Sequence, residues 1–284
     1  MTIESIGLLH PGEMGAGIGA ALVRAGYRVT WASAGRRQPS ARRAQTAGLV
    51  DVESVEAIRR ESDLVVSVCP PHAALDVAKR ICGFSGLYLD ANAIAPATAG
   101  EVAGVIESGG GSYVDGAIIG SPPQIPPPAS GQGPRLYLSG PRAAEVRQVF
   151  RGTPVEAIVV SAARTSASAL KMSYAAWSKG SAALLLSARA LAVSQGVEEP
   201  LLAEWERSQP DLDGRSIRAG QQASMKGWRW VGEMEEIAKA YRSAGLPDGF
   251  HRAAAEVFSR PVRYEEAVPD DATLATVLEA LLGR

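Results

Sequence analysis

The sequence predicts two domains, an α/β domain with a mostly parallel sheet over residues 1–160 and an all-α domain over residues 161–284. Up to about residue 160, short apolar runs alternate with amphipathic stretches, the pattern of strand–helix–strand units. From there to about residue 195 the chain is rich in Ala, Leu and Ser, and its one glycine is Gly180. A stretch without helix breakers predicts a long helix.

The first domain contains six candidate strands and five helical patterns. The strands are short apolar runs at residues 5–10, 28–32, 64–69, 86–90, 112–115 and 135–139. The helical patterns cover residues 15–25, 55–61, 73–81, 96–108 and 142–150. Strand and helix alternating in this way predict a sheet covered by helices on both faces. The proline-rich segment 122–128 is expected to be a loop, because proline lacks the amide donor that regular structure needs.

The second domain is expected to be helical throughout. A central helix of roughly 35 residues would be about 52 Å long. Its large side chains lie on nearly every face: Met172, Tyr174, Trp177, Leu184, Leu185, Leu186, Leu191 and Val193. A helix that is apolar all round is buried, so we expect a homodimer that covers this helix through the helical domain. Further helices are predicted over residues 200–206, 216–244, 249–259 and 272–282.

Composition excludes several classes of function. The chain of 284 residues has 29 Lys and Arg against 30 Asp and Glu, which argues against nucleic acid as a partner. Apolar stretches are too short to span a membrane, and the N-terminus has no signal-peptide pattern, so we expect a cytoplasmic protein without membrane contact. The two cysteines, Cys69 and Cys82, form no CxxC pair and no histidine cluster accompanies them, so neither a disulfide nor a metal site is expected.

The turn after the first apolar run is typical of a dinucleotide-binding site. In the fingerprint G-x-G-x-x-G, glycines allow the tight turn and the close approach of a pyrophosphate. His10 stands in the first glycine position, Gly12 and Gly15 occupy the second and third, and an Ala/Leu-rich helix follows. We therefore predict a Rossmann-type domain rather than an ordinary glycine turn. The expected cofactor contacts in this turn are His10, Pro11, Gly12, Glu13 and Met14.

The residues after the second strand favour NADP(H) over NAD(H). A site for NAD usually has Asp or Glu there to bind the ribose hydroxyls. This chain instead has Ser33, Arg36 and Arg37, which suit a 2′-phosphate. Arg42 and Arg43, further along, are interpreted as solvated residues at the start of a basic helix.

A second set of cofactor contacts is expected where the third and fourth strands end. Cys69 is the last residue of the strand 64–69, and Pro70 and Pro71 follow it directly. This places them at the sheet edge where nucleotides bind. His72 follows them and could be either a proton shuttle or a structural histidine. Asn92 could hydrogen-bond to the nicotinamide amide or to the substrate, although asparagine is also common in plain turns.

Four segments resemble the β-hydroxyacid dehydrogenases, relatives of 6-phosphogluconate dehydrogenase and of imine reductases. Residues 6–15 are similar to the family's opening fingerprint, and residues 90–96 to its Asp-x-Ser-Thr-x-x-Pro loop. Residues 113–121 are similar to its Asp-Ala-Pro-Val-Ser-Gly-Gly segment, and Lys171 stands where the family has its catalytic lysine. The second half resembles an uncharacterised C-terminal domain type attached to such nucleotide-binding domains.

The resemblance implies an NAD(P)-dependent dehydrogenase or reductase that acts on a small-molecule substrate. It implies a substrate site formed by Asn92, Gly120, Ser121 and Lys171. Two residues depart from the family pattern, because Ile119 replaces a serine and Ala175 replaces an asparagine. Both of the usual residues help to hold a substrate carboxylate or hydroxyl, so a bulkier or less polar substrate than a small 3-hydroxy acid is also consistent with the sequence.

Lys171 is the candidate general acid/base. Hydride transfer to or from an alcohol carbon requires a group that accepts or donates the hydroxyl proton. The neighbours of Lys171 in the sequence are small or apolar, so burial would lower its pKa toward neutrality, whereas a lysine extending to solvent is the structural alternative. Tyr174, three residues later, shares the helix face and could be a second acid or a core aromatic.

Other residues in the helical half carry weaker hypotheses. Trp228 and Trp230 fit core or dimer packing better than a substrate pocket, and residues 249–252 could reach a substrate anion. Three functions therefore remain open. They are an NADP(H)-dependent hydroxy-acid oxidoreductase that uses Lys171, an imine reductase that uses Tyr174, and an NADP(H)-binding sensor or scaffold without turnover.

Overall fold

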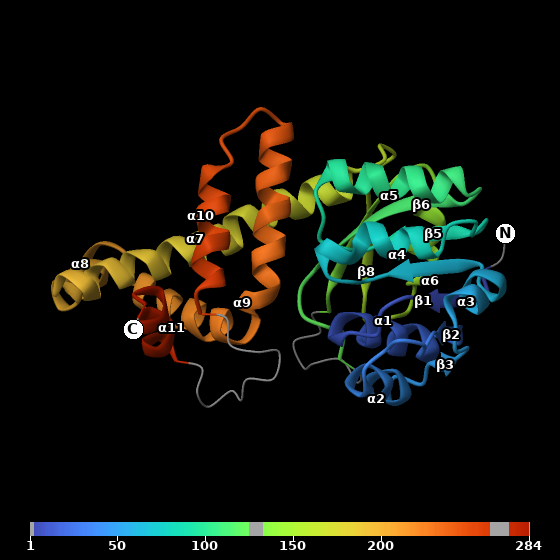
Figure 1. Ribbon diagram of the computed structural model, residues 1–284, viewed down its shortest axis with the longest axis horizontal. Helices are drawn as coiled ribbons and strands as arrows, with labels where there is room; N and C mark the ends of the chain where they lie inside the picture. The colour runs from blue at the N-terminus through green and yellow to red at the C-terminus, as the bar shows by residue number, and fades with distance from the viewer. Residues whose placement is uncertain (1–2, 125–132, 262–272, 284) are drawn as a thin grey trace. The chain divides into compact units, whose positions relative to one another are not determined.

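The computed structural model describes residues 3–124, 133–261 and 273–283 and divides into two compact units, shown in Figure 1. The first, Met1–Lys171, is called the strand–helix unit here, and the second, Met172–Arg284, the helical unit. This division confirms the predicted fold class, an α/β Rossmann-type part followed by an all-α part. The division lies after Lys171 rather than after residue 160, because the first turn of the long helix is hydrogen-bonded to the sheet.

The strand–helix unit contains eight strands in one sheet, in the order β3-β2-β1-β4-β5-β6-β7-β8. The strands are β1 Ser5–Leu8, β2 Arg28–Trp31, β3 Val50–Asp51, β4 Leu64–Ser67, β5 Leu87–Asp90, β6 Ser112–Ile119, β7 Arg135–Ser139 and β8 Glu156–Ser161. Neighbouring strands are parallel except β6 and β7, which are antiparallel. Two strands, β3 and β8, were not predicted, and β6 continues four residues beyond the predicted Asp115 to Ile119.

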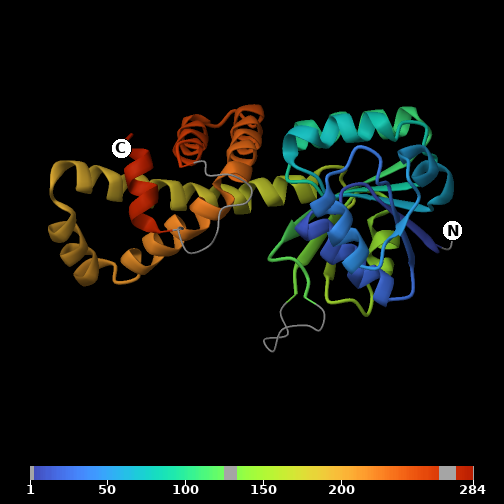
Figure 2. The same cartoon turned by 60° about the horizontal axis from the view of Figure 1, so that its bottom comes forward.

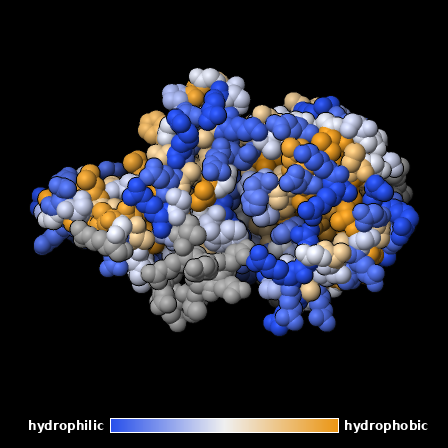
Figure 3. All heavy atoms as spheres, in the orientation of Figure 1, coloured by the Kyte–Doolittle hydropathy of each residue, from blue (hydrophilic) through white to orange (hydrophobic). Residues whose placement is uncertain are grey.

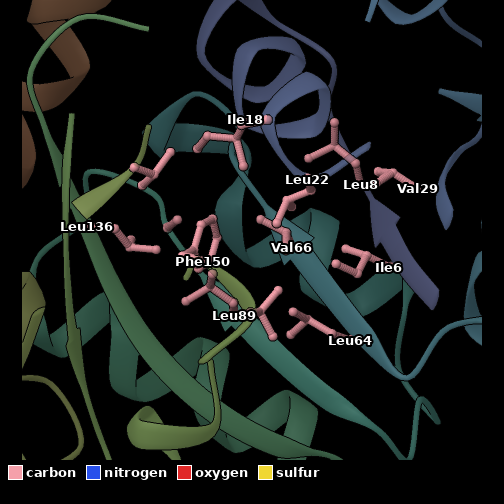
Figure 4. Packing of buried hydrophobic residues seen from close by; sticks show 14 of the residues in the cluster. Ile6, Leu8, Ile18, Leu22, Val29, Leu64, Val66, Leu89, Leu136 and Phe150 are labelled. Atoms are coloured by element: carbon pink, nitrogen blue, oxygen red, sulfur yellow. The ribbon is translucent and has the colours of Figure 1, made fainter. Parts of the chain in front are cut away.

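Helices cover both faces of this sheet. They are α1 Glu13–Arg24, α2 Gln38–Thr46, α3 Val55–Glu61, α4 Ala74–Arg80, α5 Pro96–Ser108 and α6 Ala143–Val149, with the short 3-10 helix η1 at Pro71–Ala73. Residues of α1, α2 and α6 form one core with the sheet, and residues of α3, α4 and α5 form a second core on the other face. Figure 2 shows α1 and α5 on opposite sides of the sheet. Figure 4 shows the first core, in which Ile18 and Leu22 of α1 pack on Leu8 and Val66.

The order of the strands positions the ligand edge. Strand β1 lies between β2 and β4. The chain first builds β2 and β3 on one side of β1, and then crosses over to build β4 and the later strands on the other side. In sheets of this kind ligands bind at the carboxyl ends of the strands, where the strand order reverses. The predicted turn of residues 10–15 follows β1 at that place.

The helical unit consists of the rest of α7 Ser166–Gln195 with four further helices, α8 Glu198–Ser208, α9 Leu212–Ser243, α10 Gly249–Ser259 and α11 Leu274–Leu281. The central helix has 30 residues, somewhat fewer than predicted, because β8 occupies the chain up to Ser161. The other four helices lie where the sequence predicts them, with ends shifted by a few residues. Residues 125–128 of the predicted proline-rich loop lie outside the described part of the chain, and Pro122–Gln124 have no regular structure.

Candidate functional site

The turn between β1 and α1 has the geometry of a dinucleotide-binding turn. The Gly12 amide donates to the His10 carbonyl oxygen at 2.9 Å. A Cβ atom at Gly15 would lie 2.2 Å from the same oxygen, so a side chain at this position would displace the turn. Gly12 precedes α1 without a capping hydrogen bond from a described side chain, which leaves the N-terminus of α1 open to an anion. These features fit the pyrophosphate of a dinucleotide.

His10, in the first glycine position, is held by Arg36. One guanidinium nitrogen of Arg36, Nη1, lies 2.9 Å from His10 Nδ1, and the other, Nη2, donates to the Leu9 carbonyl oxygen at 2.6 Å. Burial, followed by the charges of Arg36 and Arg43, lowers the pKa of His10 to about 4. His10 is therefore neutral at physiological pH, and its Nδ1 accepts the hydrogen bond from the arginine.

Arg36 therefore contacts the dinucleotide turn, and it also belongs to the region predicted to bind the 2′-phosphate. Its position as a 2′-phosphate ligand stays a prediction, as does that of Arg37, which is exposed. The interpretation of Arg43 as a solvated residue is wrong, because its Nε donates to the Pro11 carbonyl oxygen at 3.2 Å. Two arginines from the β2–α2 region thus hold the backbone of the turn.

A carboxylate that the sequence analysis missed lies beside Ser33. Asp51, at the end of β3, accepts hydrogen bonds from the amides of Ser33 at 3.2 Å and Glu53 at 2.8 Å. We had expected no carboxylate near the end of β2, since none follows it in the sequence. Asp51 lies on β3, a strand of two residues that is too short for a hydrophobic pattern to reveal.

Asn92 connects the ends of β4 and β5. Its Oδ1 accepts from the Cys69 amide at 2.6 Å, and its Nδ2 donates to Ser67 Oγ at 3.1 Å. The residue is 2% exposed, and its amide group bridges two strands in this structure. The proposed contact of Asn92 with nicotinamide or substrate stays a prediction. Burial raises the pKa of the Cys69 thiol to about 12, so Cys69 is a protonated thiol beside Pro70 and Pro71.

Two buried carboxyl groups lie side by side at this edge. Asp90 and Asp115 are register partners on β5 and β6, and their exposed fractions are 1% and 0%. Burial raises the pKa of Asp90 to about 7 and that of Asp115 to about 6, and the charge of Asp115 adds to the effect on Asp90. Neither residue was singled out as functional from the sequence.

Lys171 turns toward strand β6. Its Nζ donates to the Ile118 carbonyl oxygen at 2.7 Å. Burial lowers the pKa of the Lys171 ammonium from 10.5 to about 8. The small and apolar neighbours of Lys171 in the sequence predict this direction of the pKa shift. An amine with this pKa exchanges a proton readily near neutral pH.

The predicted site residues of the strand–helix unit lie on one edge of the sheet. Residues 10–14 follow β1, Cys69 follows β4, Asn92 follows β5, and Gly120 and Ser121 follow β6. Gly120 has a φ of 123°, a conformation that favours glycine, and it turns the chain out of the strand. A Cβ atom at Gly17 of α1 would lie 3.0 Å from Pro123, so the segment that carries Ser121 passes close to the helix after the dinucleotide turn.

The remaining candidate residues, most of them in the helical unit, differ in their exposure to solvent. The Tyr174 side chain is 50% exposed, so Tyr174 is not a core aromatic. Trp230 is buried and packs edge-on against Phe258 with ring centroids 5.0 Å apart, as expected for core packing. Of the residues 249–252, His251 is buried against Tyr241, while Phe250 is 81% exposed. Arg252 pairs with Asp248 at 3.3 Å. His72, in the strand–helix unit, is exposed.

The described residues contain no group of three or more His, Cys, Asp or Glu side chains placed to hold a metal ion. Within those same ranges, no helix has the length and apolar character needed to cross a membrane.

Two family models match parts of the chain. One, described as "NADP oxidoreductase coenzyme F420-dependent", matches residues 5–87, and the other, "Domain of unknown function (DUF1932)", matches residues 192–260. Among curated proteins, an uncharacterized 28.5 kDa protein encoded in the 7S RNA 5′ region of Methanothermus fervidus is 29% identical over 170 residues. That alignment covers 59% of this chain and 63% of the relative, so it spans less than two thirds of the relative's length.

Two solved structures are similar over nearly the whole chain. A conserved hypothetical protein from Sinorhizobium meliloti is 26% identical, covering 98% of this chain and 97% of its own, with a TM-score of 0.69. A conserved protein of unknown function, described as structurally similar to 3-hydroxyacid dehydrogenases, is also 26% identical. It covers 90% of this chain and 96% of its own, with a TM-score of 0.66.

More distant structures share the fold. A 3-hydroxyisobutyrate dehydrogenase from Mycobacterium tuberculosis is 19% identical, covering 99% of both chains with a TM-score of 0.66. An imine reductase from Myxococcus stipitatus in complex with NAD+ is 20% identical, covering 99% of this chain and 100% of its own, with a TM-score of 0.56. The 3-hydroxyisobutyrate dehydrogenase and the imine reductase share the fold of this chain, and together with the second solved structure they confirm the predicted resemblance to the β-hydroxyacid dehydrogenases. The family model matched by residues 5–87 supports a general role as an oxidoreductase.

Proposed function

We propose that this protein is an NADP(H)-dependent oxidoreductase in which Lys171 is the general acid/base. The substrate class is a hydroxy acid or a related alcohol or carbonyl compound. The observation that carries this proposal is the Lys171 ammonium, which is held by the Ile118 carbonyl oxygen at 2.7 Å and has a pKa lowered to about 8. The cofactor, when bound, supplies the hydride chemistry.

Lys171 can move the proton that accompanies hydride transfer. With a pKa near 8, it holds a proton in a large fraction of molecules at neutral pH and can release it without a strong base. In its charged form it also stabilises negative charge that develops on a substrate oxygen. The hydrogen bond to Ile118 holds Nζ near the end of β6, the strand that Gly120 and Ser121 follow in the sequence.

The arginines at the β2–α2 region support NADP(H). Arg36 uses Nη1 and Nη2 on the dinucleotide turn, and exposed Arg37 is adjacent to it. A 2′-phosphate would meet this positive charge. Asp51 lies at the same place and accepts from the Ser33 amide, so the preference for the phosphorylated cofactor is expected to be partial rather than absolute.

The direct test is nicotinamide absorbance with NADPH and NADH across 2- and 3-hydroxy acids, their keto forms and cyclic imines. We expect turnover of an alcohol or carbonyl substrate, faster with the phosphorylated cofactor, and a loss of at least 100-fold in Lys171→Met, the size of a general acid/base contribution. Lys226→Met, at an exposed lysine of α9, is the matched control. Turnover retained by Lys171→Met would refute the role of Lys171, and cofactor binding without any turnover would favour a sensor.

Imine reduction is the second candidate, and the exposure of Tyr174 favours it. Tyr174 follows Lys171 by three residues on α7, and half of its side chain is accessible. A phenol so placed could donate a proton to a substrate nitrogen. Turnover of cyclic imines that survives in Lys171→Met and is lost in Tyr174→Phe would establish this second function.

We also infer a homodimer formed through the helical unit. Three large side chains, Trp177, Leu184 and Leu191, follow one another at intervals of seven residues along α7 and are 71%, 71% and 64% exposed. This spacing places them in one stripe, the pattern by which helices pair with a second helix. In the space-filling view, hydrophobic residues lie among hydrophilic ones on the surface of the helical unit (Figure 3). A second copy of the chain would cover the stripe, and light scattering should give twice the mass of one chain.

A further inference from the structure

The start of helix α7 is attached to the sheet by a buried carboxylate. Asp115 Oδ2 accepts from the Ser168 amide at 2.8 Å, and Asp115 Oδ1 accepts from Ser168 Oγ at 2.5 Å. Ser139 Oγ, from β7, donates to Asp115 Oδ2 at 3.0 Å and accepts from the Ala167 amide at 2.9 Å. We call Asp115, Ser139 and Ser168 the α7 clasp. All three side chains are buried, with exposed fractions of 0%, 0% and 1%.

The clasp and the Lys171 contact involve the same two elements with the same spacing. Asp115 and Ile118 are three residues apart on β6, and Ser168 and Lys171 are three residues apart on α7. Asp115 binds Ser168, and Ile118 binds Lys171. Residues three apart on a helix lie on one face, so both contacts are made by the face of α7 that meets β6. The helix therefore has two attachment points on one strand.

We propose that the α7 clasp is the positioning device for Lys171. Asp115 and Ser168 fix the start and rotation of α7, so that the Lys171 ammonium reaches the end of β6 instead of turning to solvent. This inference rests on the proposed role of Lys171, and it assigns Asp115, Ser139 and Ser168 as positioning residues for the same reaction.

Ordinary helix capping does not explain the clasp. A capping side chain usually belongs to the residue just before the helix, whereas Asp115 is 53 residues away from Ser168 in the sequence. A buried carboxyl group is costly unless hydrogen bonds compensate for it, and Asp115 receives three, from the Ser168 amide, the Ser168 hydroxyl and the Ser139 hydroxyl. A cap from the preceding loop would stabilise the helix end without this burial. The clasp therefore fixes the orientation of α7 on the sheet in addition to stabilising its first turn.

The environment of Lys171 shows what the clasp would preserve. Burial is the cause of its lowered pKa, with no neighbouring charge contributing. If α7 turned or shifted, Nζ would become more accessible to water and its pKa would rise toward 10.5. The titration of Lys171 therefore reports the position of the helix, and a loss of stability alone would not change it.

The experiment measures the pH dependence of Lys171 acetylation by acetic anhydride, with mass spectrometry of the full-length protein, and requires no substrate. In the unmodified sequence we expect half-maximal reactivity near pH 8. In Ser168→Ala and in Asp115→Asn we expect the midpoint to rise by about one pH unit or more. The matched control is Ser194→Ala, because Ser194 Oγ donates to Leu191 O of the same helix at 2.7 Å and has no part in the clasp.

If Asp115→Asn fails to fold, Ser168→Ala still tests the clasp. It removes the hydroxyl but leaves the backbone amide of residue 168 bonded to Asp115. Once a substrate is known, both variants should lower kcat about tenfold or more, with the dissociation constant for the dinucleotide unchanged. An unchanged Lys171 midpoint in a folded Ser168→Ala would overturn the clasp proposal, even if Lys171→Met is inactive. Full turnover by Lys171→Met would instead refute the proposed function and leave the clasp measurement valid.

Discussion

The two units of the chain differ in how completely they bury their large apolar side chains. In the described part of the strand–helix unit, three valines are more than about a third exposed: Val50, Val159 and Val160. In the described part of the helical unit, the corresponding residues are Tyr174, Trp177, Leu184, Leu191, Val197, Ile217, Met225, Leu246 and Phe250. The valines lie on the two edge strands of the sheet, whereas four of the nine lie on α7.

This difference teaches which unit can be stable as a single copy. The sheet is covered by helices on both faces, and its two cores hold most of the buried apolar side chains of the unit. Among the described residues of the helical unit, Trp177, Leu184 and Leu191 of α7 stay exposed in a single chain. The proposed homodimer would bury this stripe, and the strand–helix unit has no comparable stripe in its described part.

The largest expected effect is on association. Leu184→Asp places a charge in the middle of the α7 stripe, where Leu184 is 71% exposed in one chain. A buried, unpaired carboxylate at a dimer interface is costly, so light scattering should change from the mass of two chains to that of one. Thermal unfolding of the separated chains should show the helical unit melting before the strand–helix unit.

Leu246→Asp is the matched control for this variant. Leu246 is 53% exposed and follows α9, away from the α7 stripe in the sequence. It should leave the mass unchanged. If both variants remain dimers, α7 is not the interface, and the contrast between the two units has another cause.

The next effect sharpens the strand–helix side of the contrast. Gly15→Ala would place a Cβ atom 2.2 Å from the His10 carbonyl oxygen, so the β1–α1 turn must shift. We expect a loss of about 1–3 kcal/mol in the free energy of unfolding and at least tenfold weaker NADPH binding, measured by fluorescence titration. Gly104→Ala, at an exposed position of α5 where a Cβ would meet nothing within 4 Å, should leave binding unchanged. Equal NADPH binding by both variants would contradict the proposed cofactor turn.

The most local effect is a pH dependence within the sheet, because it involves a single buried carboxyl group. Burial raises the pKa of Asp90 to about 7, above its unfolded value, so its contribution to stability is full below about pH 4 and is lost as the pH rises through 7. Asp90→Asn removes this titration. The variant should therefore gain stability relative to the original sequence between pH 5 and pH 8, by up to about 4 kcal/mol. Denaturant unfolding at the two pH values measures it, and a pH-independent difference would argue against a raised pKa.

The fold was largely predictable, because strand–helix alternation and the missing breakers of α7 leave strong patterns. The prediction missed β3 and β8 for different physical reasons. β3 has two residues, too few for any periodicity, and β8 is an edge strand without a buried residue, so it lacks the alternation of apolar and polar residues that marks a half-buried strand. The apolar residues of α7 predicted burial on all sides, but one side is exposed in a single chain.

The candidate site was predictable only where its residues can be recognised from their neighbours in the sequence. The turn at residues 10–15, Cys69 and Lys171 were placed on their elements by neighbouring residues. Asp51, Asp115 and Ser168 were missed because they act across the sheet, through contacts between strands and helices far apart in the sequence. Such contacts have no local pattern, and only the three-dimensional arrangement shows them.

Arg36 has a consequence for engineering the cofactor preference of this protein. Because its guanidinium holds both His10 and the Leu9 carbonyl, it is part of the turn as well as part of the region that would select the phosphate. A substitution at Arg36 would change selectivity and turn geometry together, so its effect depends on which residue stands at position 10. Design toward NADH should therefore begin at exposed Arg37 and keep Arg36 with His10 as one inherited pair.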